Sequence, residues 1–569
     1  MDARERYQAW LDHLLIDNDT KAELRALDSD PAEIEDRFFR TLEFGTGGMR
    51  GQMGAGSNRM NIYTVRLAVQ ALAHTLKKTG RTAGGVVIAY DSRHKSREFA
   101  EEAAAVLVGN LIPVYVFPAI APTPLLSYAV RYCQASAGIV ITASHNPPAY
   151  NGLKVYNERG NQVLAEEADV ISSHMAALSL EDVFIDKNPK GSELWRECGE
   201  ELLDAYYERL LAITPDVEGG HDLRILYTPL HGTGARFVPE ILRKASFHAV
   251  STVTEQMVPD GDFSTVRSPN PEARDAYELA FAYAEKDPFD LIIATDPDAD
   301  RMGVAVLDGD DWVLLNGNQI GVLLLDFILS HLPADKRNKG VVVKTIVTTE
   351  MVDAVAEHYG VEVRSTLTGF KYIGELIDLL PEEGRVFIFG FEESYGYLAG
   401  DAVRDKDAVL ASLLIAKAAA FYKQQGLTLL QRLQALFQTH GYYLQGSCAY
   451  EFASSLEAER GAKLISRLQE TPIPVIGSEQ VVRMLDYSTG KSLDLKTGEE
   501  GLIDLPQERV LQWITQGGSK VTLRPSGTEP KMKLYLEVRA GDKRVGETRL
   551  AALQQAFDQI VREALATGL

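Results

Sequence analysis

The sequence predicts an α/β protein built from several domains. Short runs rich in valine and isoleucine recur along the chain, and each is followed by a loop and by residues compatible with a helix. These runs are VVIAY from Val86, GIVIT from Gly138, RILYT from Arg224, LIIAT from Leu291, VVVKTI from Val341 and VFIFG from Val386. Near-continuous apolar strands that alternate with helices are typical of parallel or mixed sheets covered on both faces.

The length of the chain predicts its division into domains. A chain of 569 residues is too long for one hydrophobic core, and at about 100 to 200 residues per domain it should contain three to five. Boundaries are expected near residue 210, after the charged segment ELLDAYYERLLAI, near 318, after the turn at Asn316, and near 440. The predicted domains are three α/β domains, residues 1–210, 211–318 and 319–440, and a smaller α+β domain, residues 441–569.

The last predicted domain differs from the others in its sequence pattern. It contains the turn-rich stretch DYSTGKSLDLKTGEEGLIDLP, then the expected strands KVTL and KLYLEVRA and a closing helix. Within it, Gly490-Lys491-Ser492 has the form of the end of a nucleotide-binding P-loop. That interpretation fails because the first glycine of such a loop would fall on Leu485, and because the segment has the pattern of a hairpin.

Composition limits the classes of partner. The 58 Lys and Arg residues against 80 Asp and Glu residues give a net charge of −22, which argues against a nucleic-acid or anionic-membrane surface. An anionic ligand therefore needs a local basic pocket. The three cysteines are far apart in the sequence and match no disulfide or metal-ligand pattern, which favours a reducing compartment.

Targeting signals are not expected. The first ten residues, MDARERYQAW, are charged and lack the apolar stretch of a signal peptide. The most apolar helical stretch, Ala408 to Tyr422, is interrupted by Lys417 and is shorter than the ~20 residues of a membrane span. We expect a cytoplasmic protein with this segment packed as a helix; the sequence does not indicate its oligomeric state.

The stretch TASHNPPAYNGLKVY, Thr142 to Tyr156, places a serine just after the apolar run GIVIT. Open α/β folds carry their chemistry at the carboxyl ends of strands, so Ser144 is the candidate nucleophile, with Asn146, Asn151 and Lys154 near enough to orient or neutralise an anion. The alternative is that Ser144 and its neighbour His145 only cap the following turn.

A second stretch, DPDADR, follows the run LIIAT. Asp296, Asp298 and Asp300 alternate on what we expect to be an extended loop, where three carboxylates converge on a small hard cation such as Mg²⁺. A helix-loop-helix calcium site requires glycine at the sixth position and glutamate at the twelfth, where this chain has Arg301 and Leu307. An acidic surface turn is the remaining alternative.

Three further stretches carry polar groups suited to a sugar phosphate. GFEESYGY, from Gly390 to Tyr397, offers Glu392 and Ser394 to neighbouring hydroxyls, and an exposed polar loop is its alternative. Downstream, Arg404 and Lys406 either reach the same cleft or only flank the start of a helix.

The remaining two stretches lie near the ends of the chain. RPSGTEPKMKLY combines Arg524 and nearby lysines with the turn formed by Ser526, Gly527 and Thr528, which suits a phosphate monoester; a plain turn between strands is the alternative. GTGGMRG, Gly45 to Gly51, is expected to be a glycine-rich loop ending at Arg50.

Taken together and in this order, GTGGMRG, TASHNPPAYNGLKVY, DPDADR, GFEESYGY and RPSGTEP resemble the signature loops of the α-D-phosphohexomutase family, in its phosphoglucomutase and phosphopentomutase branch. The resemblance spans the chain from about Gly45 to its end. It implies four domains around a central cleft. The first loop departs slightly from the family, with Gly47 and Met49 where alanine or serine and leucine are common.

The resemblance also implies roles for individual residues. Ser144 is expected to carry a phosphoryl group and, with Asp296, Asp298 and Asp300, to bind Mg²⁺. Arg50, Lys154, Arg301 and Lys406 are expected at basic active-site positions, with Lys154 and Lys406 as candidates for proton transfer. His145 is expected to orient neighbouring groups, and the alternative is that it carries out the proton transfer itself. The Glu392 and Ser394 loop is expected to hold sugar hydroxyls, and Arg524, Ser526, Gly527 and Thr528 the distal phosphate.

The function that these expectations describe is a phosphoglucomutase interconverting glucose 1-phosphate and glucose 6-phosphate. Glucose 1,6-bisphosphate is expected as activator and intermediate, and small sugar phosphates as the partners. Two alternatives stay open: a phosphopentomutase acting on ribose or deoxyribose phosphates, and a phosphosugar-binding protein that has lost turnover.

Overall fold

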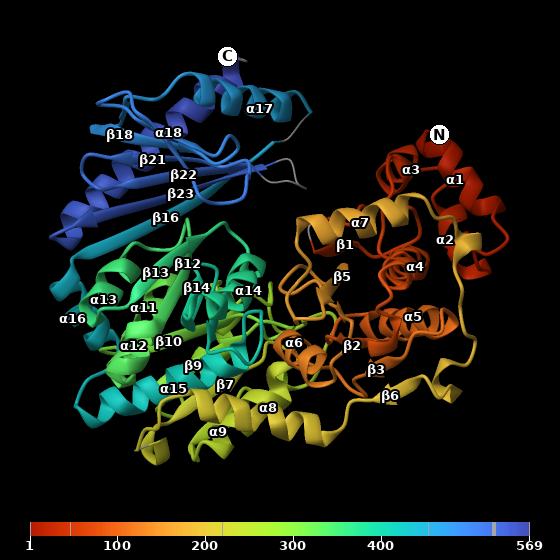
Figure 1. The fold of residues 1–569 in the computed structure, drawn as a ribbon, viewed down its shortest axis with the longest axis horizontal. Helices are drawn as coiled ribbons and strands as arrows, with labels where there is room; N and C mark the ends of the chain where they lie inside the picture. The colour runs from red at the N-terminus through yellow and green to blue at the C-terminus, as the bar shows by residue number, and fades with distance from the viewer. Residues whose placement is uncertain (1, 46, 219, 453–454, 526–530, 568–569) are drawn as a thin grey trace. The chain divides into compact units, whose positions relative to one another are not determined.

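The computed structural model describes residues 2–45, 47–218, 220–452, 455–525 and 531–567. Figure 1 traces the chain as a ribbon. It folds into two compact units, the first made of residues 1–342 with 370–429 and the second of residues 343–369 with 430–569.

Helices and strands alternate along most of the first unit. Its α-helices are α1 Ala3–Asp12, α2 Asn18–Ala26, α3 Pro31–Phe38, α4 Ile62–Lys78, α5 Ser96–Gly109, α6 Thr123–Tyr132, α7 Ala165–Ala176, α8 Glu200–Ile213, α9 Gly234–Lys244, α10 Glu278–Ala284, α11 Gly317–His331, α12 Ala334–Lys339, α14 Phe370–Leu379 and α15 Ala408–Gln424. Its strands are β1 Gly48–Gln52, β2 Val86–Tyr90, β3 Val114–Val116, β4 Ala137–Ile141, β5 Tyr150–Asn157, β6 Trp195–Glu197, β7 Ile225–Thr228, β8 Val250–Thr252, β9 Leu291–Thr295, β10 Met302–Asp308, β11 Asp311–Leu315, β14 Val386–Glu392 and β15 Gly396–Ala399.

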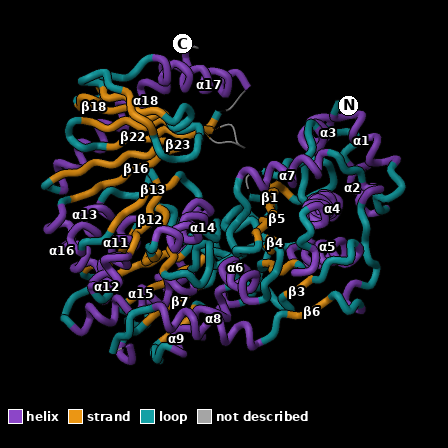
Figure 2. The backbone as a smooth tube through the Cα atoms, viewed as in Figure 1, coloured by secondary structure: helices purple, strands orange, loops and turns teal. Residues whose placement is uncertain are grey.

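The first sheet has the strand order β1-β5-β4-β2-β3-β6 and is mixed. β2 pairs parallel with β3 and β4, whereas β5 pairs antiparallel with both β4 and β1. All five residues of β2 and of β4 are buried, because α4, α5 and α7 contribute to the core on one face and α6 packs against β2 and β4. Figure 2 shows these strands between the flanking helices.

Arg50 belongs to a strand, so the expectation of a glycine-rich loop ending there is wrong. β1 lies antiparallel to β5, with Arg50 opposite Gly152 and Gly48 opposite Lys154. A Cβ atom on Gly48 would lie 2.0 Å from the carbonyl oxygen of Leu153. The glycines therefore allow close pairing of two strands, which fixes Arg50 beside the nucleophile loop.

The second sheet has the order β11-β10-β9-β7-β8. β7, β8 and β9 are parallel, and β10 pairs antiparallel with β9, Met302 lying opposite Thr295. The segment DPDADR is the connection between β9 and β10. Because the two strands are antiparallel neighbours, this connection is a tight turn, which corrects the expectation of an extended loop.

The remainder of the first unit contains a β-hairpin and a buried helix. β14 and β15 pair antiparallel, with Glu392 opposite Gly396. Helix α15 is buried on nearly all sides and begins at the N-cap Asp407, so the packing predicted for the apolar stretch is confirmed. Within the part of the chain that the structure describes, no helix combines the length and the apolar character that a membrane span needs.

An amino-terminal helical cluster precedes the first sheet and was not anticipated. Helices α1 to α3 begin at the N-caps Asp2, Asp17 and Asp30, whose carboxylates accept from main-chain amides of the first turns. The helices bury their own small core, which includes Tyr7 and Phe38. Short 3₁₀ helices complete the connections of the first unit: η1 Thr82–Gly84, η2 Leu180–Asp182, η3 Pro189–Gly191, η4 Gly220–Asp222, η5 Thr254–Met257, η6 Arg274–Tyr277 and η7 Leu380–Glu383.

The second unit contains an antiparallel sheet with the order β16-β23-β22-β21-β18-β19-β20. Its elements are the helices α13 Met351–Tyr359, α17 Ser455–Glu470 and α18 Lys543–Thr567, and the strands β13 Glu362–Thr366, β16 Tyr442–Glu451, β17 Val475–Ile476, β18 Glu479–Asp486, β19 Lys491–Asp494, β20 Glu500–Leu502, β21 Leu511–Thr515, β22 Lys520–Pro525 and β23 Lys531–Ala540. The boundary between the units falls inside β12 Gly340–Thr345 and at the start of α16 Leu429–His440. Helices α17 and α18 pack against each other and share one core with the sheet.

Two features of the second unit bear on the sequence analysis. β18 and β19 form an antiparallel hairpin around Gly490, which confirms that this segment is not a P-loop. The expected strands KVTL and KLYLEVRA are β22 and most of β23. Residues 343–369 attach to the sheet through the ion pair between Lys520 and Glu350.

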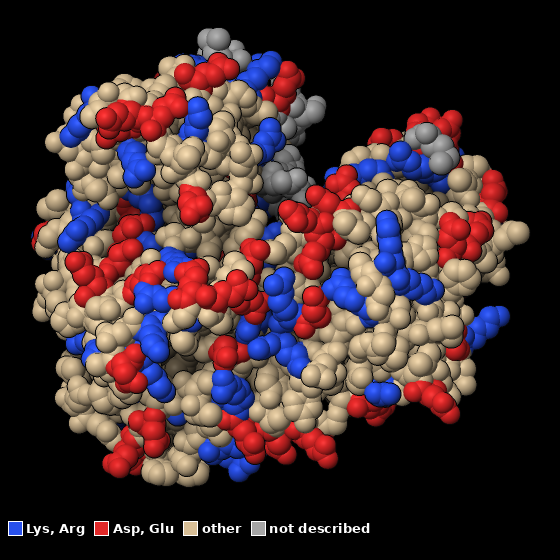
Figure 3. Space-filling view, in the orientation of Figure 1, with Lys and Arg blue, Asp and Glu red and all other residues tan. Residues whose placement is uncertain are grey.

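The chain carries a net charge of −22. On the face drawn in Figure 3, acidic and basic side chains are interspersed on each unit. Over the residues that the structure describes, this face therefore offers no extended basic surface to an anionic ligand.

Candidate functional site

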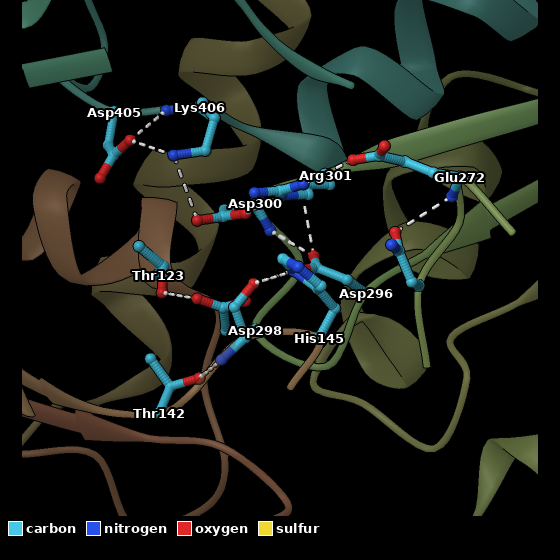
Figure 4. A network of polar contacts seen from close by, with 12 residues as sticks. Thr123, Thr142, His145, Glu272, Asp296, Asp298, Asp300, Arg301, Asp405 and Lys406 are labelled. Carbon is cyan, nitrogen blue, oxygen red and sulfur yellow. Dashed lines mark hydrogen bonds and ion pairs between the residues drawn. The ribbon is translucent and has the colours of Figure 1, made fainter. Parts of the chain in front are cut away.

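Three aspartates of the β9–β10 turn form the centre of the candidate site. Asp296, Asp298 and Asp300 are each at most 2% exposed, and one carboxylate oxygen from each lies within 4.8 Å of the others. Among the described residues, this is the group of acidic, histidine or cysteine side chains close enough together to hold a metal ion. Three buried carboxylates this close repel one another unless cations lie among them. Figure 4 shows them at the centre of a network of polar contacts.

The turn itself orders these side chains. Asp296 Oδ1 accepts from the main-chain amides of Asp300 and Arg301, at 3.1 and 3.0 Å. Ala299 adopts the left-handed conformation, with φ of 51°. The polypeptide therefore wraps around the carboxylate of Asp296, and the alternate residues Asp298 and Asp300 are brought to the same side.

Ser144 contacts this cluster directly. Its hydroxyl donates to Asp296 Oδ2 at 2.6 Å, although the two residues follow strands of different sheets and are 152 positions apart. Ser144 is 4% exposed and has φ of 51°, a conformation that is uncommon for a residue other than glycine. Its amide donates to Thr142 Oγ1. The geometry favours a functional serine over a simple turn cap.

Two lysines bring positive charge to the cluster. Lys154 Nζ lies 2.9 Å from Asp298 Oδ2 and 3.4 Å from Asp300 Oδ2. Lys406 Nζ lies 3.3 Å from Asp300 Oδ2 and 3.0 Å from Asp405 Oδ1. Lys406 thus reaches the site, whereas Arg404 is directed elsewhere and pairs with Asp378.

The charges of the cluster shift the pKa values of its members. Burial raises the pKa of Asp296 well above its usual range, and the neighbouring carboxylates of Asp298 and Asp300 add to this. Burial acts in the same direction on Asp298, but the ammonium group of Lys154 outweighs it and lowers the pKa of Asp298. Conversely, the carboxylates overcome burial and raise the pKa of Lys154 and of Lys406. The site therefore holds both lysines in the charged form.

Comparisons with known proteins identify the family of the chain. Models of phosphoglucomutase/phosphomannomutase α/β/α domains I, II and III match residues 41–182, 204–309 and 316–440. The phosphoglucomutase of Staphylococcus haemolyticus (strain JCSC1435) is 37% identical over 521 residues, which are 90% of this chain and 93% of that protein. The chain belongs to the phosphoglucomutase/phosphomannomutase family. It is therefore an enzyme, a phosphotransferase mutase of carbohydrate metabolism.

Further relatives and solved structures are consistent with the family. The phosphoglucomutase of Staphylococcus aureus (strain MRSA252) is 36% identical over 519 residues, 90% of this chain and 92% of that protein. Parafusin, a phosphoglucomutase from Paramecium in its open form, has a TM-score of 0.67 at 19% identity and covers 93% of this chain and 96% of its own. A phosphoglucomutase/phosphomannomutase family protein from Burkholderia thailandensis has the same score and identity, with 92% and 97% covered. These structures show the fold and confirm the predicted fold class. The family models and the Staphylococcus relatives confirm the family resemblance.

Three further predicted residues, His145, Arg50 and Asn151, belong to the part of the chain that matches domain I. His145 Nδ1 is 3.2 Å from Ser144 Oγ, and burial together with the nearby Arg301 and Arg50 lowers the pKa of His145 well below 6.5. Arg50 is exposed and donates to Asn146 Oδ1 at 2.9 Å. Asn151 is engaged inside the domain, where its amide donates to the carbonyl oxygen of His94 and to Ser96 Oγ.

Arg301 and the β14–β15 hairpin complete the part of the site within the first unit. Arg301 Nη1 lies 2.6 Å from Glu272 Oε1, and its Nε lies 3.9 Å from Asp300 Oδ1. Glu392 is buried at the end of β14, and its charge helps to raise the pKa of Arg301 and of Lys406. Ser394 is half-buried in the turn between β14 and β15.

The predicted phosphate loop belongs to the second unit. Arg524, in β22, donates from Nη2 to Glu508 Oε1 at 3.0 Å. Ser526, Gly527 and Thr528 lie outside the described residues.

Sequence reasoning missed several residues that shape the site. Arg93 donates to four main-chain carbonyl oxygens of the nucleophile loop, those of Ser144, Asn146, Pro147 and Tyr150. Thr123 Oγ1 donates to Asp298 Oδ2 at 2.8 Å. A signal for Arg93 was present, because the polar run DSRHKS follows the buried strand β2 as TASHN follows β4. Thr123 gives no comparable signal.

Proposed function

We propose that this enzyme interconverts α-D-glucose 1-phosphate and glucose 6-phosphate through a phosphoryl group carried on Ser144. The bond between phosphorus and Ser144 Oγ breaks as a bond to the free sugar hydroxyl forms, and the glucose 1,6-bisphosphate so made returns its other phosphoryl group to the same oxygen. The observation that carries the proposal is the 2.6 Å contact of Ser144 Oγ with Asp296, inside a buried cluster of three carboxylates and two lysines.

The carboxylate cluster is proposed to hold Mg²⁺. Oxygen donors suit this ion, and Asp298 Oδ1 and Asp300 Oδ1 are buried with no hydrogen-bond partner among the described residues, so the donor set fits. Asp296, Asp298 and Asp300, with an oxygen from Ser144 or its phosphoryl group, would be the ligands. When bound, the cation would draw negative charge from the transferring phosphoryl oxygens.

Proton transfer is proposed for groups beside the reacting oxygens. The raised pKa values of Lys154 and Lys406 keep both protonated, which suits stabilisation of the charge that develops on the reacting oxygens. The family resemblance also makes both lysines candidates for the proton transfers at the attacking and leaving oxygens. His145, whose pKa is lowered, is the neutral group near Ser144 Oγ and is suited to orient it or to accept a proton. Arg50 is proposed to neutralise the phosphoryl oxygens.

Substrate binding is proposed for the remaining predicted residues. Arg301, Glu392 and Ser394 are assigned to the sugar hydroxyls and the nearer phosphate. Arg524, Ser526, Gly527 and Thr528 are assigned to the distal phosphate, as the family resemblance implies. The four-domain division at residues 210, 318 and 440, and a cytoplasmic location, are part of the same proposal.

The decisive experiment is phosphorus NMR of the purified protein with Mg²⁺ and a trace of glucose 1,6-bisphosphate. Glucose 1-phosphate and ribose 1-phosphate are supplied in parallel. Conversion to glucose 6-phosphate is expected, at a rate well above that of ribose phosphate. Faster conversion of ribose 1-phosphate would make the protein a phosphopentomutase, and no conversion of either would favour a binding protein.

A covalent readout accompanies the assay. Mass spectrometry of the peptide that covers residues 138–154 should find a phosphoryl group on Ser144 after incubation with the bisphosphate. Ser144→Ala should lose both the adduct and turnover while its thermal unfolding remains close to wild type. Substantial turnover by this variant would remove Ser144 as the nucleophile.

A further inference from the structure

Two carboxylates hold the ammonium group of Lys406 at the site. A lysine side chain has several rotatable bonds, and fixing its ammonium group requires a partner at a defined place. Lys406 has two such partners, Asp300 and Asp405, and it contacts Asp405 both through Nζ at 3.0 Å and through its main-chain amide at 2.8 Å. The orientation of the Asp405 carboxylate therefore decides where the ammonium group lies.

The two oxygens of Asp405 have separate partners. Oδ1 accepts from Lys406, whereas Oδ2 accepts from the hydroxyl of Tyr156 at 2.6 Å. Tyr156 is fully buried, and burial together with Asp405 raises its pKa well above 10, so the hydroxyl remains a donor. Because Asp405 follows Tyr156 by 249 positions, this contact joins the first sheet to the segment before α15.

Tyr156 and Lys154 occupy neighbouring positions on one face of β5. Residues i and i+2 of a strand point to the same side, and these two side chains reach Asp405 and Asp298 respectively. One strand thus places Lys154 at the carboxylate cluster directly and reaches Lys406 through Asp405. Both ammonium groups converge on Asp300 Oδ2.

Two neighbouring residues restrict the position of the Lys406 side chain. A Cβ atom on Gly396 would lie 2.0 Å from Lys406 Cδ, so only glycine leaves room for the lysine stem. The ring of Phe370 lies 5.5 Å from Nζ on another side. Figure 4 shows Lys406 between Asp405 and Asp300, with contacts to both.

We propose that Tyr156 is a positioning residue for phosphoryl transfer, which acts by fixing the carboxylate of Asp405 so that this carboxylate holds Lys406 against the carboxylate cluster. The proposal rests on the role given to Lys406 in the proposed function. Tyr156 is fully buried and its hydroxyl donates to Asp405, so its contribution passes through that carboxylate.

The kinetic test is a double-mutant cycle between Tyr156→Phe and Lys406→Ala. Tyr156→Phe should lower kcat about ten- to hundredfold with little change in KM, because a misplaced reacting group slows the chemical step more than binding. In the Lys406→Ala background the same substitution should lower kcat by less than about twofold, because the ammonium group that Asp405 positions is already absent. Equal losses in both backgrounds would overturn the proposal.

Tyr206→Phe is the matched control. Tyr206 is also fully buried, and its hydroxyl donates at 2.8 Å to a buried aspartate of the same segment, Asp407, which caps α15 instead of contacting Lys406. We expect thermal destabilisation comparable to that of Tyr156→Phe with kcat within about twofold of wild type. A loss of kcat equal to that of Tyr156→Phe would mean that the effect belongs to the whole segment and would overturn the proposal.

A crystal structure of Tyr156→Phe provides a readout that does not depend on turnover. The ammonium group of Lys406 should leave hydrogen-bond distance of Asp405 Oδ1 while Lys154 stays on Asp298. If Lys406 keeps its place, the proposal is wrong even where the enzyme is active. If wild type turns over no sugar phosphate, the proposed function fails, and this structure still decides whether Tyr156 positions Lys406.

Discussion

Arg93 holds the main chain of Ser144: its guanidinium donates to the Ser144 carbonyl oxygen from a side chain that is wholly buried. The same group donates to three further carbonyl oxygens of the loop and lies 3.4 Å from Asp91. A planar fork with several donors can serve four carbonyls at once, which an ammonium group cannot. The unusual backbone conformation of Ser144 is thus over-determined by its surroundings.

Arg93→Lys should therefore impair catalysis through the nucleophile loop. The charge is kept, but most of the carbonyl contacts are lost, and the hydroxyl of Ser144 is no longer fixed beside Asp296. We expect kcat to fall about a hundredfold, with a smaller change in KM. Steady-state kinetics and the extent of Ser144 phosphorylation measure the effect.

Arg59→Lys is the control for Arg93→Lys. Arg59 is similarly buried and donates to the main-chain carbonyls of Asp36 and Asn58, in the amino-terminal part of the chain. The Arg59→Lys variant should have a lower thermal stability than wild type but the same kcat. Equal kcat losses in the two variants would show that burial of an arginine, and not the loop of Ser144, is what matters.

The metal prediction concerns Asp300. Asp300→Asn keeps one oxygen donor but removes a negative charge, so the affinity for Mg²⁺ should fall about tenfold or more. Isothermal titration of the purified protein with MgCl₂ measures this without turnover. The exposed residue Asp311, also in the second sheet, provides the control Asp311→Asn, whose affinity should equal that of wild type. Unchanged affinity in Asp300→Asn would contradict the assignment of the cluster to a metal.

Features that depend on residues close together in the sequence could be predicted, whereas features that depend on residues far apart in the sequence could not. The apolar runs were sufficient to locate β2, β4, β7, β9, β12 and β14, because a strand buried on both faces is a continuous run of apolar residues. Asp296, Asp298 and Asp300 were found because a six-residue segment carries the whole pattern. The turn conformation was not foreseen, since it depends on the antiparallel pairing of β9 with β10.

Tyr156 and Asp405 illustrate what sequence could not supply. Each is an ordinary residue in its local context, and the pair exists only because two distant segments meet. The amino-terminal helices are a different case. Asp2, Asp17 and Asp30 are N-caps of a common type, so the sequence of residues 1–40 does carry a local signal for the starts of three helices.

A stability prediction tests the pairing of β1 with β5. Gly48→Ala would put a methyl group 2.0 Å from the carbonyl oxygen of Leu153, so the strands must separate. We expect a loss of about 4 kcal/mol or more, the range of severe backbone clashes, together with displacement of Arg50. Thermal denaturation monitored by circular dichroism measures the loss.

Gly80→Ala separates the clash from the backbone strain. Gly80 also has a positive φ, of 70°, but a Cβ atom there meets nothing within 4 Å. It should cost about 1 kcal/mol, the strain alone. If the two glycine variants were equally stable, close approach of β1 to β5 would not be the reason for Gly48.

The last prediction concerns Asp407 and pH. Burial raises the pKa of Asp407 from 3.8 to about 6, although the N-cap hydrogen bond from Leu410 and the hydroxyl of Tyr206 oppose this. The folded state therefore binds a proton more tightly than the unfolded state. The stability that this proton contributes is complete below pH 3.8 and is lost as pH rises through 6, and it amounts to about 3 kcal/mol.

Asp407→Asn removes the titration while keeping an oxygen that can cap α15. Differential scanning calorimetry of both proteins between pH 4 and pH 7 should show the advantage of wild type over the variant shrinking by about 1.4 kcal/mol per pH unit between pH 4 and pH 6 and levelling off above pH 6. A difference that stays constant across this range would mean that Asp407 is ionised throughout. In that case the ion would be stabilised by its hydrogen bonds in spite of its burial, and the pKa would lie near or below its usual value.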